Sequence, residues 1–225
     1  MVRHLAIIMD GNRRFAQRLL NNPLKGHVWG RDKLKEVGSW AREAGIKELT
    51  LYAFSAQNFS RPKKEFDHLM QLFREGCDEL LAQDSDGVRV RFVGDLERFP
   101  EDVHERMKHV MARTQHHTEY VMNVCVGYGG REEITAAVKE LAREVQQGLL
   151  SSEDISMQTI SDRLEISEPD LIIRTGGEVR TSNFLVWQSW YSEWFFVDTL
   201  WPDFSKEEFD MIIEEFSARK RRFGR

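Results

Sequence analysis

Four segments of the chain combine arginines, small residues and, in places, an acid, a composition suited to binding phosphate groups. They are residues 10–14, 55–61, 127–131 and 174–182, and each follows a run of apolar residues. Guanidinium groups bind phosphate oxygens as a two-pronged fork, and backbone N–H groups of small residues form anion cradles. If the four segments meet in space, they would form a phosphate or diphosphate site.

Two acids, Asp10 and Glu193, stand out in this arginine-rich setting. Mg²⁺ that bridges a diphosphate prefers carboxylate ligands, so these two side chains are candidate metal ligands. Each residue alone also has a simpler interpretation, because Asp10 is suited to cap a helix, His27 is typical of a cap or a core, and surface arginines pair with neighbouring acids. Only the joint occurrence of the clusters favours a site.

The elements that would position these segments are alternating strands and helices. Apolar patterns and turn residues predict strands over residues 5–9, 49–54, 88–93, 120–126, 171–173 and 194–197. Helices are predicted between them, with no linker or repeat. This order predicts an α/β fold with one domain over residues 1–225, in which helices flank a mostly parallel six-stranded sheet. Parallel strands end at a common carboxyl edge, where we expect the polar segments to meet.

Composition narrows the function classes. The 225 residues are 41% apolar and 31% charged, with a formal net charge of −5. Because there is no domain-wide basic field, we do not expect a nucleic-acid partner. Two cysteines make no disulfide framework or zinc quartet, and polar residues interrupt the most apolar stretch, so we expect a cytoplasmic protein without a membrane span. The sequence also lacks a P-loop and a nucleophile elbow.

A set of motifs in a fixed order makes the chain recognisable. The motifs are residues 4–12, 26–27, 49–55, 58, 61–62, 128–131, 170–178, 180, 182–184, 187–188, 193, 200–204 and 222–224. Each motif alone is weak evidence for a family, but their order and spacing together are highly specific for one. Along nearly its whole length the chain resembles the cis-prenyltransferases, the undecaprenyl-diphosphate synthase family.

The resemblance implies a Mg²⁺-dependent homodimer that adds isopentenyl diphosphate to an allylic prenyl diphosphate and makes each new double bond cis. It implies that Asp10 and Asn58 are catalytic, and that Asp10 and Glu193 hold the metal. The residues implied to bind the allylic diphosphate are Gly11, Asn12, Arg13, Arg14 and His27. Those implied to bind isopentenyl diphosphate are Arg61, Arg174, Arg180 and Ser182, with Ser55 and Phe59 organising the substrates and Arg222 and Gly224 approaching from the partner subunit. The proton acceptor stays open between the displaced diphosphate and a network centred on Asn58.

The apolar residues Ala53, Leu69 and Phe73 have two interpretations. The resemblance implies a hydrophobic product tunnel between sheet and helices, which they would line. Plain core is an equal alternative, because a tunnel wall and a core share the same composition. A greasy product also implies peripheral contact with a membrane.

Among several departures from the family pattern, two are the most serious. Pro23 stands where an arginine is common, and Val179 stands where a polar residue is common. These departures keep open a short-chain or irregular, branched prenyl diphosphate synthase on the same fold. A non-catalytic subunit of a heteromeric prenyltransferase ranks lower, because such subunits tend to lose the loop at Asp10 and the arginine sites that this chain keeps.

Overall fold

A parallel β-sheet forms the centre of the computed structural model, which describes residues 1–20, 25–82 and 87–219. Its strands are β1 (His4–Ile8), β2 (Glu48–Ser55), β3 (Val88–Val93), β4 (Tyr120–Tyr128), β5 (Leu171–Arg174) and β6 (Glu193–Phe196). They lie in the order β3-β4-β2-β1-β5-β6, and every neighbouring pair is parallel. The predicted six-stranded sheet is confirmed, and it is wholly parallel in the described residues.

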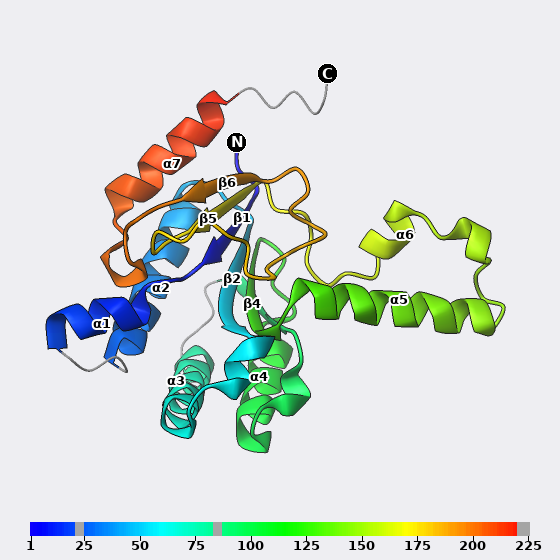
Figure 1. The fold of residues 1–225 in the computed structure, drawn as a ribbon, viewed down its shortest axis with the longest axis horizontal. Coiled ribbons are helices and arrows are strands. Elements are labelled where there is room, and N and C mark those ends of the chain that lie inside the picture. The colour runs from blue at the N-terminus through cyan, green and yellow to red at the C-terminus, as the bar shows by residue number, and fades with distance from the viewer. Residues whose placement is uncertain (21–24, 83–86, 220–225) are drawn as a thin grey trace.

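Helices cover the sheet (Figure 1). They are α1 (Asn12–Leu20), α2 (Lys25–Glu43), α3 (Lys63–Ala82), α4 (Glu101–Thr114), α5 (Gly130–Gln146), α6 (Met157–Ser161) and α7 (Lys206–Ala218). The segment between β2 and α3 contains the short 3₁₀ helix Ala56–Ser60. In Figure 1, α5 and α6 extend from the rest of the molecule as an arm.

Strand β1 shows why the sheet is covered on both faces. All five of its residues are buried, and its apolar run is continuous, as is typical of a central parallel strand. Successive side chains point to opposite faces. Leu5 and Ile7 therefore pack in the core that includes α2 and α7, whereas Ala6 and Ile8 pack with Tyr128 and other residues on the opposite side.

Helices α3 and α4 build a second core against β2 and its neighbours. Phe54 of β2 lies at its centre, with Met70 of α3 and Val103 of α4.

In the described part of the chain, none of the helices combines the length and the apolar character needed to cross a bilayer. Helices cover the faces of the sheet, so its carboxyl edge is where the polar loops that follow β1, β2 and β5 come together.

Candidate active site

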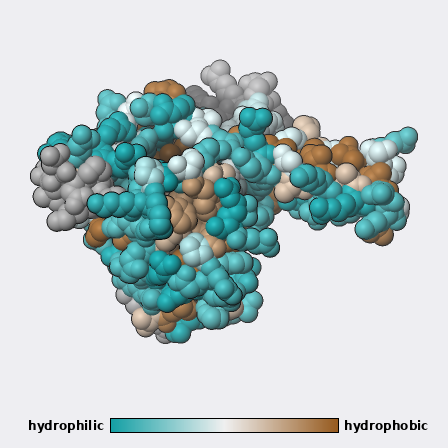
Figure 2. Space-filling model, turned by 60° about the horizontal axis from the view of Figure 1, so that its bottom comes forward, coloured by the Kyte–Doolittle hydropathy of each residue, from teal (hydrophilic) through white to brown (hydrophobic). Residues whose placement is uncertain are grey.

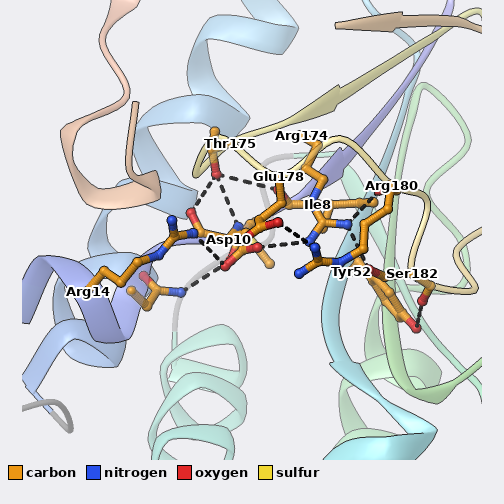
Figure 3. Close-up of polar contacts among 11 residues, drawn as sticks. Ile8, Asp10, Arg14, Tyr52, Arg174, Thr175, Glu178, Arg180 and Ser182 are labelled. Atoms are coloured by element: carbon orange, nitrogen blue, oxygen red, sulfur yellow. Dashed lines mark hydrogen bonds and ion pairs between the residues drawn. The ribbon is translucent and has the colours of Figure 1, made fainter. Parts of the chain in front are cut away.

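An ion pair between Asp10 and Arg174 forms the centre of the site (Figure 3). Asp10 follows β1, and Arg174 ends the adjacent strand β5, so parallel pairing brings them together. Arg174 Nη2 donates to Asp10 Oδ2 at 2.9 Å, and Arg14 Nη2 lies 3.4 Å from Asp10 Oδ1. Arg174 Nη1 donates to Ser182 Oγ at 2.7 Å. Arg174 is only 3% exposed, whereas the Asp10 side chain is 32% exposed, so a buried guanidinium meets a carboxylate that solvent and ligands can reach.

The backbone of Asp10 is held by Thr175, which the sequence did not single out. The Asp10 N–H donates to Thr175 Oγ1 at 3.1 Å, and this hydroxyl donates to the Asp10 carbonyl at 2.8 Å. The next residue, Gly176, has φ +89°, and a Cβ there would lie 2.6 Å from Arg14 Nη2. The Arg14 guanidinium could move aside, but the positive φ and the Asp10 backbone atoms 3.1 Å from that Cβ favour glycine at this position.

Ser182 and Asn183 hold the loop beyond Arg174 in an unusual conformation. Both have positive φ, 50° and 65°, in the left-handed region. The Tyr52 hydroxyl donates to the Ser182 carbonyl at 3.2 Å, and the Asn183 carboxamide oxygen accepts from the Arg131 N–H at the head of α5 at 3.0 Å. Surrounding contacts therefore fix a strained loop at the site.

A second charged group surrounds Glu65, a buried acid that the sequence analysis missed. Arg61 Nη1 donates to Glu65 Oε1 at 2.9 Å, and Arg13 Nη1 lies 3.8 Å from Glu65 Oε2. His27 Nε2 lies 3.8 Å from Glu65 Oε1. Burial, together with the charge of Arg61, lowers the pKa of His27 to about 4, so its imidazole is neutral at pH 7. The available signal was the spacing of four residues between Arg61, just before α3, and Glu65 in the first turn of that helix.

Asn58 is oriented by a backbone contact. Its carboxamide oxygen accepts from the Ser55 N–H at 3.0 Å. The contact orients the amide, whose oxygen can accept one further hydrogen bond and whose NH₂ group can donate to a substrate.

A cleft of about 780 Å³ joins these groups. The predicted residues that line it are Asp10, Gly11, Asn12, Arg13, Arg14, His27, Ala53, Ser55, Asn58, Arg61, Leu69, Arg174, Arg180 and Ser182. Arg180 pairs with Glu178 at its rim. Phe59 was expected here, but it packs against Phe54 and Phe99 at ring distances of 5.0 and 5.1 Å and does not line the cleft.

An apolar cavity of about 260 Å³ adjoins the cleft. The two share Met9, Asn12, His27, Ala53 and Leu69 as lining residues. Phe73, the third residue expected at a tunnel, lines the apolar cavity. A polar cleft beside an apolar cavity suits a substrate with a charged head and a hydrocarbon tail.

The structure separates the two predicted metal ligands. Glu193 is the first residue of β6 and pairs in register with Leu171, at the amino end of β5, whereas Asp10 lies beyond the carboxyl end. Glu193 Oε2 accepts from Arg219 at 2.7 Å. The expectation that both acids hold one ion is therefore wrong within this chain. Arg222, Gly224 and Pro23 lie outside the described residues.

The remaining donor set still suits Mg²⁺. Among the described residues no group of three or more His, Cys, Asp or Glu side chains forms a metal cage. Mg²⁺ is commonly bound through one or two carboxylates plus substrate phosphates, and keeps several waters. Asp10, a single carboxylate at the mouth of an arginine-lined cleft, fits that pattern.

Comparisons with known proteins agree with this geometry. A family model described as "Putative undecaprenyl diphosphate synthase" matches residues 8–224. The tritrans,polycis-undecaprenyl-diphosphate synthase (geranylgeranyl-diphosphate specific) of Pyrococcus abyssi is 46% identical over 99% of this chain and 87% of its own length. The solved structure of lavandulyl diphosphate synthase from Lavandula x intermedia, with dimethylallyl diphosphate, matches with a TM-score of 0.94 and 34% identity over 100% of this chain and 98% of that one. A probable undecaprenyl diphosphate synthase from Campylobacter jejuni has a TM-score of 0.84 at 34% identity, over 100% and 99% of the two chains.

Proposed function

The chain belongs to the undecaprenyl diphosphate synthase family of cis-prenyltransferases, and on this premise we propose that it elongates geranylgeranyl diphosphate with isopentenyl diphosphate to a long polyprenyl diphosphate. The observation that carries the proposal is the arginine-lined cleft at Asp10, which opens into an apolar cavity. The choice of primer follows the relative of 46% identity, whose name specifies geranylgeranyl diphosphate.

The allylic diphosphate would bind between β1 and the head of α1. Asn12 begins this nine-residue helix, whose N-terminal N–H groups favour an anion, and Arg13 and Arg14 add guanidinium groups. Arg61, held by Glu65, faces the same cleft. These residues would stabilise the negative charge that gathers on the leaving diphosphate.

Isopentenyl diphosphate would bind at Arg174, Arg180 and Ser182. Arg174 is already fixed by Asp10, whereas Arg180 pairs with Glu178 and must exchange that partner for phosphate. We propose Asp10 as the protein ligand of Mg²⁺, which would supply charge neutralisation at the diphosphate. The two sites would place the head groups side by side and the allylic tail in the apolar cavity.

Chain growth then follows from this placement. The double bond of isopentenyl diphosphate attacks the allylic carbon, the carbon–oxygen bond to diphosphate breaks, and a proton leaves the new allylic position. The Asn58 amide is a very weak base and the pKa of His27 is lowered to about 4 by burial and neighbouring cations, so the displaced diphosphate is the better proton acceptor. The apolar walls would keep water from the cation-like carbon.

A homodimer is also proposed, with the arm of α5 and α6 as its contact. Brown side chains gather on this arm in Figure 2, and its exposed apolar residues include Val138, Leu149 and Met157. Exposed apolar groups of this kind are typical of interfaces. Light scattering after gel filtration should give twice the monomer mass. A contribution of Arg222 and Gly224 to the partner's site, a cytoplasmic location and peripheral membrane contact stay predictions.

An irregular or short-chain synthase is the second candidate. It is favoured by the TM-score of 0.94 to lavandulyl diphosphate synthase. Val179, one of the two most serious departures from the family pattern, is 75% exposed and does not line the cleft, so it gives this candidate no added support.

Product analysis tests both candidates. Purified protein would be incubated with radiolabelled isopentenyl diphosphate, Mg²⁺ and dimethylallyl, geranyl, farnesyl or geranylgeranyl diphosphate in turn, with an EDTA control. Products would be dephosphorylated and sized by chromatography. We expect an EDTA-sensitive ladder, longest with geranylgeranyl diphosphate. A single short or branched product would favour the second candidate, and no incorporation with any primer would contradict both.

A further inference from the structure

The turn that carries Ser182 has a backbone conformation that most residues disfavour. Ser182, Asn183 and Leu185 have φ of 50°, 65° and 45°, in the left-handed region that residues other than glycine seldom adopt. Asparagine tolerates this region better than most residues, so the strain falls mainly on the other two. Strained residues persist only where surrounding contacts hold them. The contacts of this turn therefore decide whether Ser182 keeps its place in the cleft.

The head of α5 holds the residue that follows Ser182. The Asn183 carbonyl accepts from the Gly130 N–H at 2.8 Å, and its carboxamide oxygen accepts from the Arg131 N–H at 3.0 Å. The Asn183 NH₂ group donates to Glu132 Oε2 at 2.7 Å. These three hydrogen bonds fix Asn183, and the orientation of Ser182 needs a contact of its own.

Tyr52 of β2 supplies that contact (Figure 3). Its hydroxyl lies 3.2 Å from the Ser182 carbonyl oxygen and 3.3 Å from that of Tyr128, so its one hydrogen is shared between them. Burial raises the pKa of Tyr52 above its ordinary value, so the hydroxyl stays protonated at neutral pH and donates. The Tyr52 ring stacks on that of buried Phe184, with centroids 4.6 Å apart.

The side chain of Ser182 depends on how its backbone is held. Ser182 Oγ accepts from Arg174 Nη1 at 2.7 Å, which leaves the hydroxyl hydrogen to donate to a phosphate oxygen. Both residues line the cleft. If the hydrogen bond from Tyr52 to the Ser182 carbonyl is lost, Ser182 can relax toward a negative φ, and its hydroxyl then turns away from Arg174.

We propose that Tyr52 is a positioning residue for isopentenyl diphosphate. Its hydroxyl holds the Ser182 backbone so that the Ser182 hydroxyl and the Arg174 guanidinium present two fixed donors to the diphosphate. Tyr52 acts through Ser182 and needs no contact with the substrate. This inference rests on the proposed function and deepens it, because it names a residue that determines affinity for one of the two substrates.

The test is steady-state kinetics of Tyr52→Phe, which keeps the ring and removes only the hydroxyl. With geranylgeranyl diphosphate saturating, the KM for isopentenyl diphosphate should rise by about 3- to 10-fold, the effect of one lost hydrogen bond. The kcat and the KM for geranylgeranyl diphosphate should stay at the parental values. The matched control is Tyr120→Phe, the same change in a buried tyrosine of β4 whose hydroxyl has no hydrogen-bond partner among the described residues. It should leave both KM values unchanged.

A double-mutant cycle separates positioning from direct contact with the substrate. Ser182→Ala removes the hydroxyl that Tyr52 positions and should itself raise the KM for isopentenyl diphosphate. In that chain, Tyr52→Phe should add less than about a further twofold, because the group through which it acts is gone.

Three results would overturn the proposal. They are an unchanged KM for isopentenyl diphosphate in Tyr52→Phe, an equal rise in the KM of both substrates, and a full further rise in the double variant. A parent chain that incorporates no label would overturn the proposed function itself, so the two failures are distinguishable.

Discussion

Polar clusters lie at both ends of the sheet, and they differ in how fully their hydrogen bonds are satisfied within the chain. At the amino end, buried His4 contacts Thr50 Oγ1 through Nε2 at 2.8 Å and Ser167 Oγ through Nδ1 at 3.0 Å. Both oxygens of Glu48 are occupied, by Asn123 at 2.7 Å and Ser167 at 2.8 Å. Every polar group in this cluster has a partner from a neighbouring segment.

The amino-end network also determines the state of His4. The Ser167 hydroxyl donates to Glu48, so His4 Nδ1 must carry the hydrogen that it shares with Ser167. Burial lowers the pKa of His4, which favours the neutral imidazole. In that form Nε2 carries no hydrogen, so the Thr50 hydroxyl, which accepts from Asn123 at 3.0 Å, donates to it.

At the carboxyl end, by contrast, positive charge exceeds negative charge and donors remain available. Asp10 and Glu65 lie among five arginines. The side chains of Arg13, Arg14 and Arg180 are 61%, 49% and 59% exposed. Buried His27 Nε2 has no hydrogen-bond partner among the described residues. The amino-end cluster, in which every polar group has a hydrogen-bond partner, therefore stabilises the fold. The carboxyl-end cluster has more guanidinium groups than carboxylates, so it can bind an anionic ligand.

We expect the largest loss of activity on substitution of Arg174. This residue is buried, like the amino-end cluster, and it also lines the cleft in which the substrate would bind. Arg174→Gln should lower kcat/KM for isopentenyl diphosphate by about 10³-fold, because a donor aimed at the diphosphate is lost. It should also lower the free energy of unfolding by about 1–3 kcal/mol, because the buried guanidinium of Arg174 no longer makes its hydrogen bonds to Asp10 and Ser182. Steady-state kinetics and urea unfolding measure the two effects. A variant with normal kcat/KM would place Arg174 with the structural cluster.

A substitution of Glu65 tests whether a buried acid at the carboxyl end affects activity by holding Arg61 in position. Glu65→Gln should reduce kcat by about 10- to 100-fold, since the guanidinium loses its fixed position. Turnover would be measured beside Asp67→Asn, an exposed change on the same helix. Equal losses in the two variants would mean that Arg61 does not depend on Glu65.

The pH dependence of stability follows from the lowered pKa of His27. Below pH about 6.5 the unfolded chain binds a proton there that the folded chain does not, so stability falls as the pH falls toward 4. The shift corresponds to about 3 kcal/mol at most. His4 acts in the same direction. Urea unfolding between pH 7 and 4.5 should therefore show a smaller slope in His27→Gln than in the parent; identical slopes would contradict the assignment.

The smallest expected effect is at the amino end. Thr50→Val removes a hydroxyl from between His4 and Asn123 and should cost about 1–3 kcal/mol of stability, because buried polar groups lose partners. Turnover per folded molecule should stay at the parental value. A matching loss of turnover would show that the two ends are coupled, which the comparison does not predict.

Strand ends explain which parts of the site the sequence could predict. Asp10 and Arg174 follow or end apolar runs, and parallel strands finish at one edge, so their meeting was predictable. Glu193 begins its strand, so the same rule puts it at the opposite edge, where it pairs with Arg219. Reading it by residue type alone gave the wrong position.

Burial explains most of the rest. Glu65 has the pattern of an ordinary acid in the first turn of a helix, and only tertiary packing places it among Arg61, Arg13 and His27. Phe59 was expected beside the substrates, but its ring packs against Phe54 and Phe99 and not in the cleft. The arm of α5 and α6 also follows from tertiary arrangement, which local periodicity does not encode.

The most direct test of the account neutralises one carboxylate at each end of the sheet. Asp10→Asn and Glu48→Gln each remove one negative charge with little change of shape. Both variants would be measured for melting temperature and for isopentenyl diphosphate incorporation per folded molecule. We expect Asp10→Asn to lose incorporation while remaining folded, and Glu48→Gln to melt earlier with incorporation retained. Normal incorporation by Asp10→Asn, or its loss in a folded Glu48→Gln chain, would contradict the assignment of chemistry to the carboxyl edge.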